Sequence, residues 1–154
     1  MSKLKIVKGY IPGSIGRVAD LHGTYYCNHW KFDLFFEAKV ATECSEFLKR
    51  YDDSRDGFWN ALIDNQIVGS ITIDGIHAAD KGAHLRWFIV SDAVKGKGVG
   101  NRLIDTAIDF CRVKRKQQIE AYIDCYNPDT NPFKWRKREI VGSQLKNNIQ
   151  NLLD

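Results

Sequence analysis

The alternation of apolar and polar residues divides the first third of the chain into a short strand and two helices. Residues 4–7 alternate in a way that predicts an edge strand, which glycine and proline turn signals end. Ser14 is a predicted N-cap, and apolar residues then recur at helical spacing in two stretches that break near residues 28–31. The apolar positions are Ile15, Val18, Leu21 and Tyr25 in the first stretch, and Phe32, Phe35, Phe36, Val40, Cys44, Phe47 and Leu48 in the second.

Further along the chain the pattern changes to strands and then returns to a helix. Residues 58–63 and 67–73 predict an antiparallel hairpin, and residues 83–90 predict a third strand. A glycine-rich loop follows and leads into an amphipathic helix, after which residues 119–123 predict another strand. The apolar face of that helix consists of Val99, Leu103, Ala107, Ile108 and Cys111. The pattern contains no internal repeat or low-complexity linker, so we expect a single α/β domain over residues 1–154.

Composition and charge narrow the class of protein. The four cysteines are scattered, with no spacing to histidine or to each other that is typical of a metal site, so we expect no metal and reduced thiols in a cytoplasmic protein. No apolar run is long enough to cross a membrane, and the N-terminus lacks an apolar leader segment. The net charge of +4 suits an anionic ligand and is too small to argue for nucleic acid by itself.

The glycine loop "KGKGVGNRLI", residues 95–104, is the main chemical motif. Glycines before a helix N-terminus let an anion approach unpaired backbone N–H groups, which suits a pyrophosphate. The spacing lacks the Gly-Lys-Ser/Thr of a P-loop. A dinucleotide fingerprint fits weakly: its third glycine comes one position early, while Glu120 and Asp124 lie about 20 residues on, where a ribose-binding acid is expected. A flexible turn without a ligand is the remaining alternative.

The same loop resembles the R/Q-x-x-G-x-G/A signature of the GNAT superfamily of N-acetyltransferases, with Lys95 where Arg or Gln is usual. The stretches "NQIVGSITI" and "AHLRWFIVSDAVKGKGVGNRLIDTAIDFCR" are similar to the family's hairpin strand and to its fourth strand, pyrophosphate loop and third helix. Residues 11–47 are similar to acetyltransferase domains found fused to winged-helix regulators, although no winged-helix segment is present. This resemblance implies a central mixed, mostly antiparallel sheet flanked by helices, with acetyl-CoA as co-substrate.

The resemblance also implies which residues bind the cofactor. The backbone of Phe88, Ile89 and Val90 would receive the pantetheine arm, although such an apolar triplet is more often simply a core strand. The loop and helix N-terminus would hold the pyrophosphate, and Asn127 matches the asparagine of a later family motif. The implied pyrophosphate residues are Lys95, Gly96, Lys97, Gly98, Val99, Gly100 and Asn101.

Two residues are candidates for acid–base chemistry. His84 stands where relatives often carry a glutamate, and a histidine has a pKa suited to a general base; a solvent-facing histidine is the alternative. Asp74 and His77 are weaker candidates because we expect them in an exposed turn. The family's acid is a tyrosine on a helix after the fifth strand, but no tyrosine stands at that offset here. Tyr126 is the candidate that remains, with solvent as an alternative proton donor.

The acceptor side and the C-terminus are the least determined parts. Tyr25, Tyr26, His29 and Trp30 could line a pocket for an amine acceptor, or they could be core residues. Residues 126–154 depart from the family and end in a predicted amphipathic helix that could pack on its own sheet or on a second subunit as a homodimer.

Three functions are consistent with these patterns. The first is an N-acetyltransferase that acetylates a primary amine by direct transfer in a ternary complex. The second is a catalytically impaired acyl-CoA-binding regulatory module, suggested by the loop together with the missing tyrosine. The third, ranked last, is a nucleic-acid or protein interaction module that uses the basic runs after residue 111, although a solvated charged surface explains these runs better.

Overall fold

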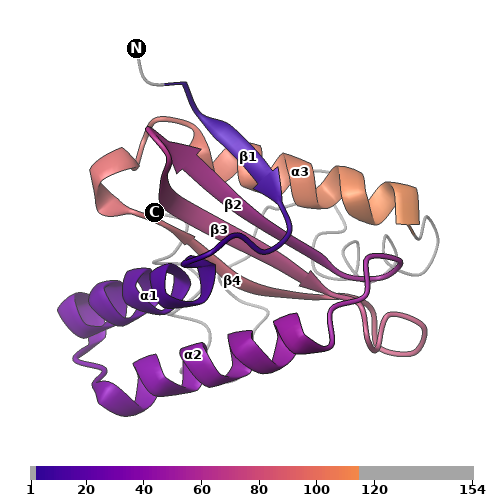
Figure 1. The fold of residues 1–154 in the computed structure, drawn as a ribbon, viewed down its shortest axis with the longest axis horizontal. Coiled ribbons are helices and arrows are strands. Elements are labelled where there is room, and N and C mark those ends of the chain that lie inside the picture. Colours follow the sequence, from indigo (N-terminus) through magenta and orange to yellow (C-terminus); the bar gives the residue numbers. More distant parts are fainter. Residues whose placement is uncertain (1–2, 115–154) are drawn as a thin grey trace, which may run out of the picture.

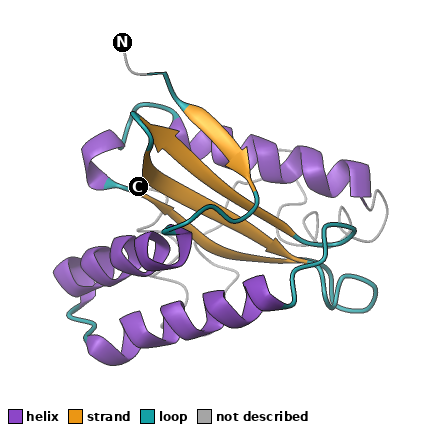
Figure 2. Ribbon diagram, in the orientation of Figure 1, coloured by secondary structure: helices purple, strands orange, loops and turns teal. Residues whose placement is uncertain are grey.

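The computed structural model describes residues 3–114, which form a four-stranded antiparallel sheet with helices on both faces (Figures 1 and 2). The strands lie in the order β1-β2-β3-β4. In Figure 1, α3 lies on one side of the sheet and α1 and α2 lie on the other. The elements are β1 (Lys5–Lys8), α1 (Ser14–Trp30), α2 (Leu34–Lys49), β2 (Gly57–Ile63), β3 (Gln66–Asp74), β4 (His84–Val90), a 3₁₀ turn (Asp92–Val94) and α3 (Val99–Lys114).

Each predicted element that lies within the described residues is present. The expected strand 119–123, and with it the parallel part of the sheet, lies outside these residues. The helix break at 28–31 corresponds to Lys31, which follows α1 with a left-handed φ of 59°. The N-cap prediction was wrong by one residue: Gly13 is the N-cap, and the Ser14 hydroxyl donates to the Ile11 carbonyl at 2.6 Å instead.

The β2–β3 hairpin turns on two residues without glycine. Asp64 and Asn65 both adopt positive φ, of 51° and 61°, as a two-residue type I′ turn requires. Asn and Asp tolerate this conformation better than other residues that carry a side chain. The turn sets the register in which Gln66 pairs with Ile63.

Two apolar layers hold the helices to the sheet. On the α3 face, the predicted helix residues Val99, Leu103, Ala107 and Cys111 pack against a cluster that includes Ile71. On the other face, Phe58 and Trp87 pack against α1 and α2. The prediction was wrong for Phe35, which is 81% exposed although it follows the helical pattern of α2.

His22 is a titratable group buried within α1. Its side chain is 5% exposed, and its Nδ1–H donates to the Val18 carbonyl at 2.8 Å. Burial lowers the pKa of His22 from 6.5 to about 4, because the charged imidazolium is poorly solvated there. The folded protein therefore contains a neutral histidine at pH values where the unfolded chain is protonated.

We expect this histidine to make the fold sensitive to mild acid. Because the folded pKa lies below the unfolded one, the stabilisation is fully present above pH 6.5 and is lost as the pH falls from about 6.5 to about 4. The loss should reach about 3 kcal/mol. Urea unfolding at a series of pH values measures it, and His22→Gln should flatten the curve over this interval. An equally steep curve in the variant would contradict the assignment.

Candidate active site

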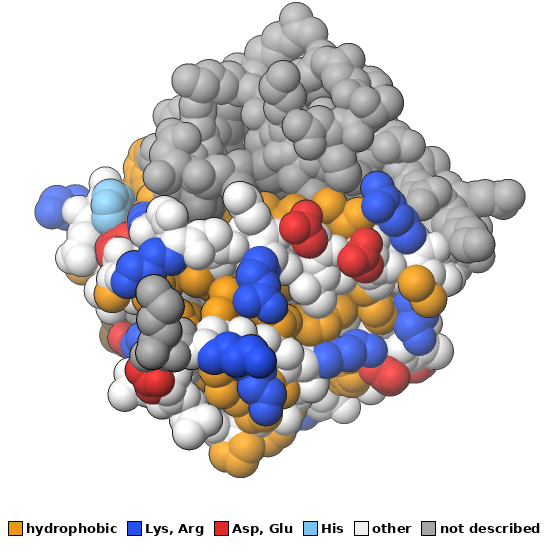
Figure 3. Space-filling view, turned by 90° about the horizontal axis from the view of Figure 1, so that it is seen from above, with side chains coloured by type: hydrophobic (Ala, Val, Ile, Leu, Met, Phe, Trp, Pro, Cys, Tyr) orange, Lys and Arg blue, Asp and Glu red, His pale blue; other side chains and the backbone are white. Residues whose placement is uncertain are grey.

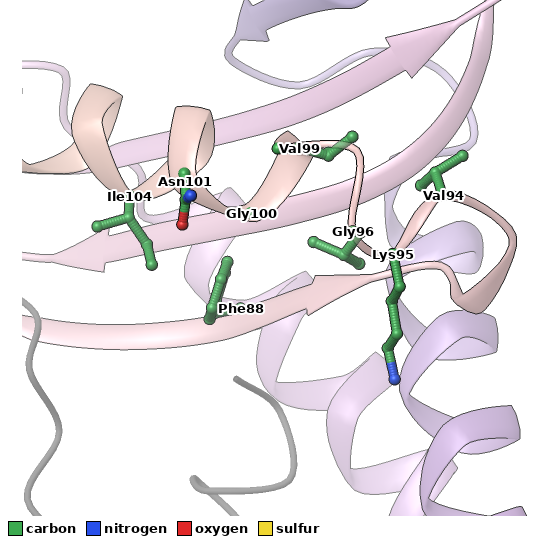
Figure 4. Close-up of a pocket in the computed structure, with 10 residues that line it drawn as sticks. Phe88, Val94, Lys95, Gly96, Val99, Gly100, Asn101 and Ile104 are labelled. Atoms are coloured by element: carbon green, nitrogen blue, oxygen red, sulfur yellow. The ribbon is translucent and has the colours of Figure 1, made fainter. Parts of the chain in front are cut away.

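The glycine loop and the first turns of α3 form one wall of a cleft, and the end of β4 forms the other. Figure 4 shows Phe88 rising from β4 toward α3, with Asn101 and Ile104 pointing back from the helix. The cavity between them has a volume of about 340 Å³. It is lined by Phe88, Val90, Val94, Lys95, Gly96, Gly98, Val99, Gly100, Asn101 and Ile104.

The local backbone explains why glycines are needed in the loop. Gly96 and Gly98 both adopt a φ of 76°, a left-handed conformation that strains any other residue. α3 then begins at Val99, and its first turn contains no acidic residue. The first N–H groups of a helix have no partner within the helix and carry partial positive charge, so this end of the cleft is suited to a phosphate.

Lys95 places a positive charge beside the loop. Its Nζ lies 2.6 Å from a carboxylate oxygen of Asp92 and 4.4 Å from the centre of the Tyr25 ring on α1. The carboxylate and the ring face therefore both stabilise the ammonium group. The contact with Tyr25 also connects the loop to α1.

The structure brings most of the predicted cofactor residues together around one cavity. Lys97 is exposed and does not line it. The Ile89 side chain is 2% exposed and packs with Leu21 and Tyr25, so only its backbone is offered on this strand. The sequence analysis missed Val94 and Ile104; Ile104 lies one helical turn after Gly100, a spacing that could have identified it.

His84 begins β4 and pairs with Asp74 of β3. The residue is exposed and does not line the cavity. Partial burial against its neighbours and the positive charge of Arg86 lower the pKa of His84 below 6.5. Its imidazole is therefore neutral at pH 7 and able to accept a proton.

The expectation that Asp74 lies in an exposed turn was wrong. Asp74 is 5% exposed, and its carboxylate lies 2.5 Å from an Arg50 nitrogen and 3.2 Å from an Arg86 nitrogen. Although burial opposes it, hydrogen bonding to these arginines lowers the pKa of Asp74. A carboxylate held in this way is a structural ion pair and a poor base. His77 is exposed, as expected.

The remaining predicted residues are distributed as follows. Tyr25 and Tyr26 are both 5% exposed and pack with Ile89 in an apolar cluster, which favours the core alternative for these two residues. His29 is exposed and stacks on the Tyr25 ring at 4.2 Å. Trp30 is partly buried and packs against the same cluster. Tyr126, Asn127 and the whole segment 126–154 lie outside the described residues.

Sequence and structure comparisons define the class of protein. A family model described as the acetyltransferase (GNAT) family matches residues 19–133, well over half of the chain. The chain belongs to this family. Comparison with curated proteins finds no match.

Several solved structures have the same fold. A GNAT family acetyltransferase from Staphylococcus aureus Mu50 is 20% identical, with a TM-score of 0.59 over 77% of this chain and 69% of that one. A predicted acetyltransferase from Clostridium acetobutylicum, solved with acetyl-CoA, is 11% identical, with a TM-score of 0.56 over 73% of this chain and 75% of that one. An acyl-CoA N-acyltransferase from Pseudomonas aeruginosa is 13% identical, with a TM-score of 0.57 over 80% of this chain and 84% of that one. The fold is therefore that of the GNAT acetyltransferases.

Residues 3–114 contain neither a metal-binding cluster nor a membrane-spanning helix. No group of three or more His, Cys, Asp or Glu side chains is placed to hold a metal ion. None of the helices in this part of the chain is both long and apolar enough to span a membrane.

Proposed function

We propose that this protein is an acetyl-CoA-dependent N-acetyltransferase that transfers the acetyl group directly to a primary amine in a ternary complex. The observation that carries the proposal is the cleft between Phe88 and Val90 on β4 and the glycine loop at the start of α3. This cleft combines an apolar wall with a phosphate-binding helix end, which are the two surfaces that the pantetheine arm and the pyrophosphate of acetyl-CoA require.

The chain's own residues have four roles in this proposal. The amides and glycines of residues 95–101 hold the pyrophosphate, and Phe88 and Val90 hold the arm. When bound, acetyl-CoA supplies an acetyl thioester: the amine nitrogen bonds to its carbonyl carbon, the carbon–sulfur bond breaks, and the sulfur takes a proton. His84 accepts the proton that the ammonium group of the acceptor must lose. Because His84 does not line the cavity, this proton reaches it through a water molecule. Tyr126 remains our candidate for the acid.

The described cysteines support direct transfer over a cysteine intermediate. Cys44 and Cys111 are buried, and burial raises the pKa of their thiols to about 11 and about 12. A thiol that stays protonated is a weak nucleophile. Cys27 is exposed, but it does not line this cavity.

We therefore expect acetyl transfer to be insensitive to thiol alkylation. N-ethylmaleimide should modify Cys27 and leave the rate unchanged, and the rate of Cys27→Ser should equal that of the wild type. Mass spectrometry locates the modified cysteines, and a thiol-independent assay of acetylated amine measures the rate. Loss of activity when Cys125 alone is alkylated would contradict direct transfer.

Calorimetric titration with acetyl-CoA, followed by mass spectrometry of a panel of primary amines, tests the proposal. Micromolar binding with turnover supports an N-acetyltransferase. Binding without turnover on any amine favours the acyl-CoA-binding regulatory module. Absence of binding would exclude both.

The described surface gives less support to a nucleic-acid module. Figure 3 shows Lys and Arg side chains on the upper face of the molecule, with acidic side chains among them. The exposed basic residues of the described part of the chain include Lys5 of β1 and Arg102 of α3, and the Arg102 guanidinium donates to the carbonyl of Leu4, just before β1, at 3.4 Å. A mixed surface of this kind is typical of a solvated face.

A further inference from the structure

β4 contains a bulge next to the cleft. Between the two flanking pairs with β3, the β3 strand contributes one residue, Ile71, and β4 contributes two, Trp87 and Phe88. The flanking pairs are Ser70–Ile89 and Thr72–Arg86. Trp87 has a φ of 46°, a left-handed conformation that is rare for a bulky residue. Such a conformation persists only where surrounding contacts hold it.

The bulge determines which side chains of β4 face the cleft. In a regular strand, residues 86, 88 and 90 would point to the same face of the sheet. Here Arg86 bonds to Glu43 of α2, and the Trp87 ring packs against Phe47 of the same helix. Phe88 instead packs on the α3 side and lines the cavity. The extra residue therefore moves Phe88 to the cleft face.

A single side chain of β3 bonds to the backbone of this bulge. The Ser70 hydroxyl donates to the Trp87 carbonyl at 2.7 Å, and Ser70 is fully buried. A bulge removes backbone groups from the strand ladder, and a buried carbonyl needs another partner. Gly69 lets the two strands approach at this point, because a Cβ there would lie 2.9 Å from the Ile89 carbonyl oxygen.

Thr72, two residues further along β3, has a different environment. Thr72 is also fully buried and on the same face of the strand, but its hydroxyl has no hydrogen-bond partner among residues 3–114. The two residues therefore provide a matched pair: one hydroxyl bonds to the bulge and its neighbour does not.

We propose that Ser70 is a positioning residue for the cofactor: its hydrogen bond to the Trp87 carbonyl holds the β4 bulge that places Phe88 and Val90 in the cleft. This inference rests on the proposed function, since it takes acetyl-CoA as the ligand of the cleft. Ser70 acts on the wall for the pantetheine arm, because its hydroxyl bonds to the backbone of β4 and not to the glycine loop. Replacement of Ser70 should therefore weaken binding of the pantetheine arm and leave binding of the nucleotide and pyrophosphate intact.

The test compares two ligands in calorimetric titrations. Acetyl-CoA contains the pantetheine arm, whereas adenosine 3′-phosphate 5′-diphosphate contains only the nucleotide and pyrophosphate. Ser70→Ala should weaken acetyl-CoA binding about 10-fold, the effect of one buried hydrogen bond, and leave binding of the nucleotide within about twofold. Thr72→Val should leave both affinities unchanged. Urea unfolding shows that both variants are folded.

Four outcomes would count against the proposals, and they can be distinguished. Unchanged acetyl-CoA binding by Ser70→Ala, or equal weakening of both ligands, overturns the role of Ser70. If the wild type does not bind acetyl-CoA, the proposed function fails instead. In that case NMR of the free protein still tests the role of Ser70 in the bulge. Ser70→Ala should change the amide chemical shifts of residues 86–90 more than Thr72→Val does, and equal changes would overturn the inference.

Discussion

Substitution of Gly100 by leucine is expected to abolish acetyl-CoA binding while the domain stays folded. Gly100 lies in the first turn of α3, and a Cβ built there would lie 3.5 Å from Phe88 Cζ and 3.7 Å from Val90 Cγ2. These are ordinary contacts, so the helix accepts a side chain at this position. The rest of a leucine side chain would occupy the cleft between α3 and β4.

The expected loss of affinity is at least about a thousandfold, or about 4 kcal/mol, because the ligand and the side chain would compete for the same space. Calorimetric titration measures it. Gly16→Leu is the matched control, since Gly16 lies within helix α1 and its Cβ would meet nothing within 4 Å. Wild-type affinity in Gly100→Leu would show that the ligand does not enter this cleft.

Gly100 is a better choice for this experiment than the other glycines of the loop. Gly96 and Gly98 have positive φ, so a substitution there strains the backbone whatever the space around it. A loss of binding in those variants would not separate a blocked site from a distorted loop.

Replacement of Asp56 by alanine is expected to destabilise the fold by about 4 kcal/mol. Asp56 is fully buried, and its carboxylate accepts from the backbone N–H groups of Gly75 at 2.9 Å and Asp52 at 3.0 Å. It also lies 3.5 Å from Arg55 Nε and 3.9 Å from Arg50 Nη1. Removal of the carboxylate leaves the buried Gly75 N–H and the partly buried Asp52 N–H without this partner, and it removes a negative charge that faces both arginines.

Urea unfolding of Asp56→Ala and Asp53→Ala tests this assignment. Asp53 lies in the same turn, but its side chain is 72% exposed and pairs with Lys8 at the surface. Surface ion pairs contribute little to stability, so the midpoint for Asp53→Ala should stay near that of the wild type. Equal midpoints for the two variants would show that the buried carboxylate is dispensable.

The elements and the main site could be predicted because their signals are local. Helical spacing identified the buried face of α3, and glycine spacing identified the loop whose residues meet around the cavity. The hairpin turn was located without its strongest sequence signal. Each of these predictions depends on neighbours within a few positions along the chain.

The features that sequence reasoning missed depend on contacts between distant segments. Asp74 comes at the end of a strand and precedes a glycine, which is typical of an exposed turn, but Arg50 approaches it from just after α2 and Arg86 approaches it from β4. The bulge at Trp87 depends on a hydroxyl 17 positions away. The burial of His22 follows from how α1 packs, which helical periodicity alone did not indicate.

The arrangement of Lys95 has a consequence for ligand selectivity. Its ammonium group already contacts the Asp92 carboxylate and the Tyr25 ring, so Lys95 does not offer an uncompensated charge to small anions. A simple monovalent ion must compete with Asp92 for the lysine. A pyrophosphate can bind the backbone amides first and depends less on that competition. Under the proposed function, we therefore expect Lys95 to favour binding of a pyrophosphate over binding of a small monovalent anion.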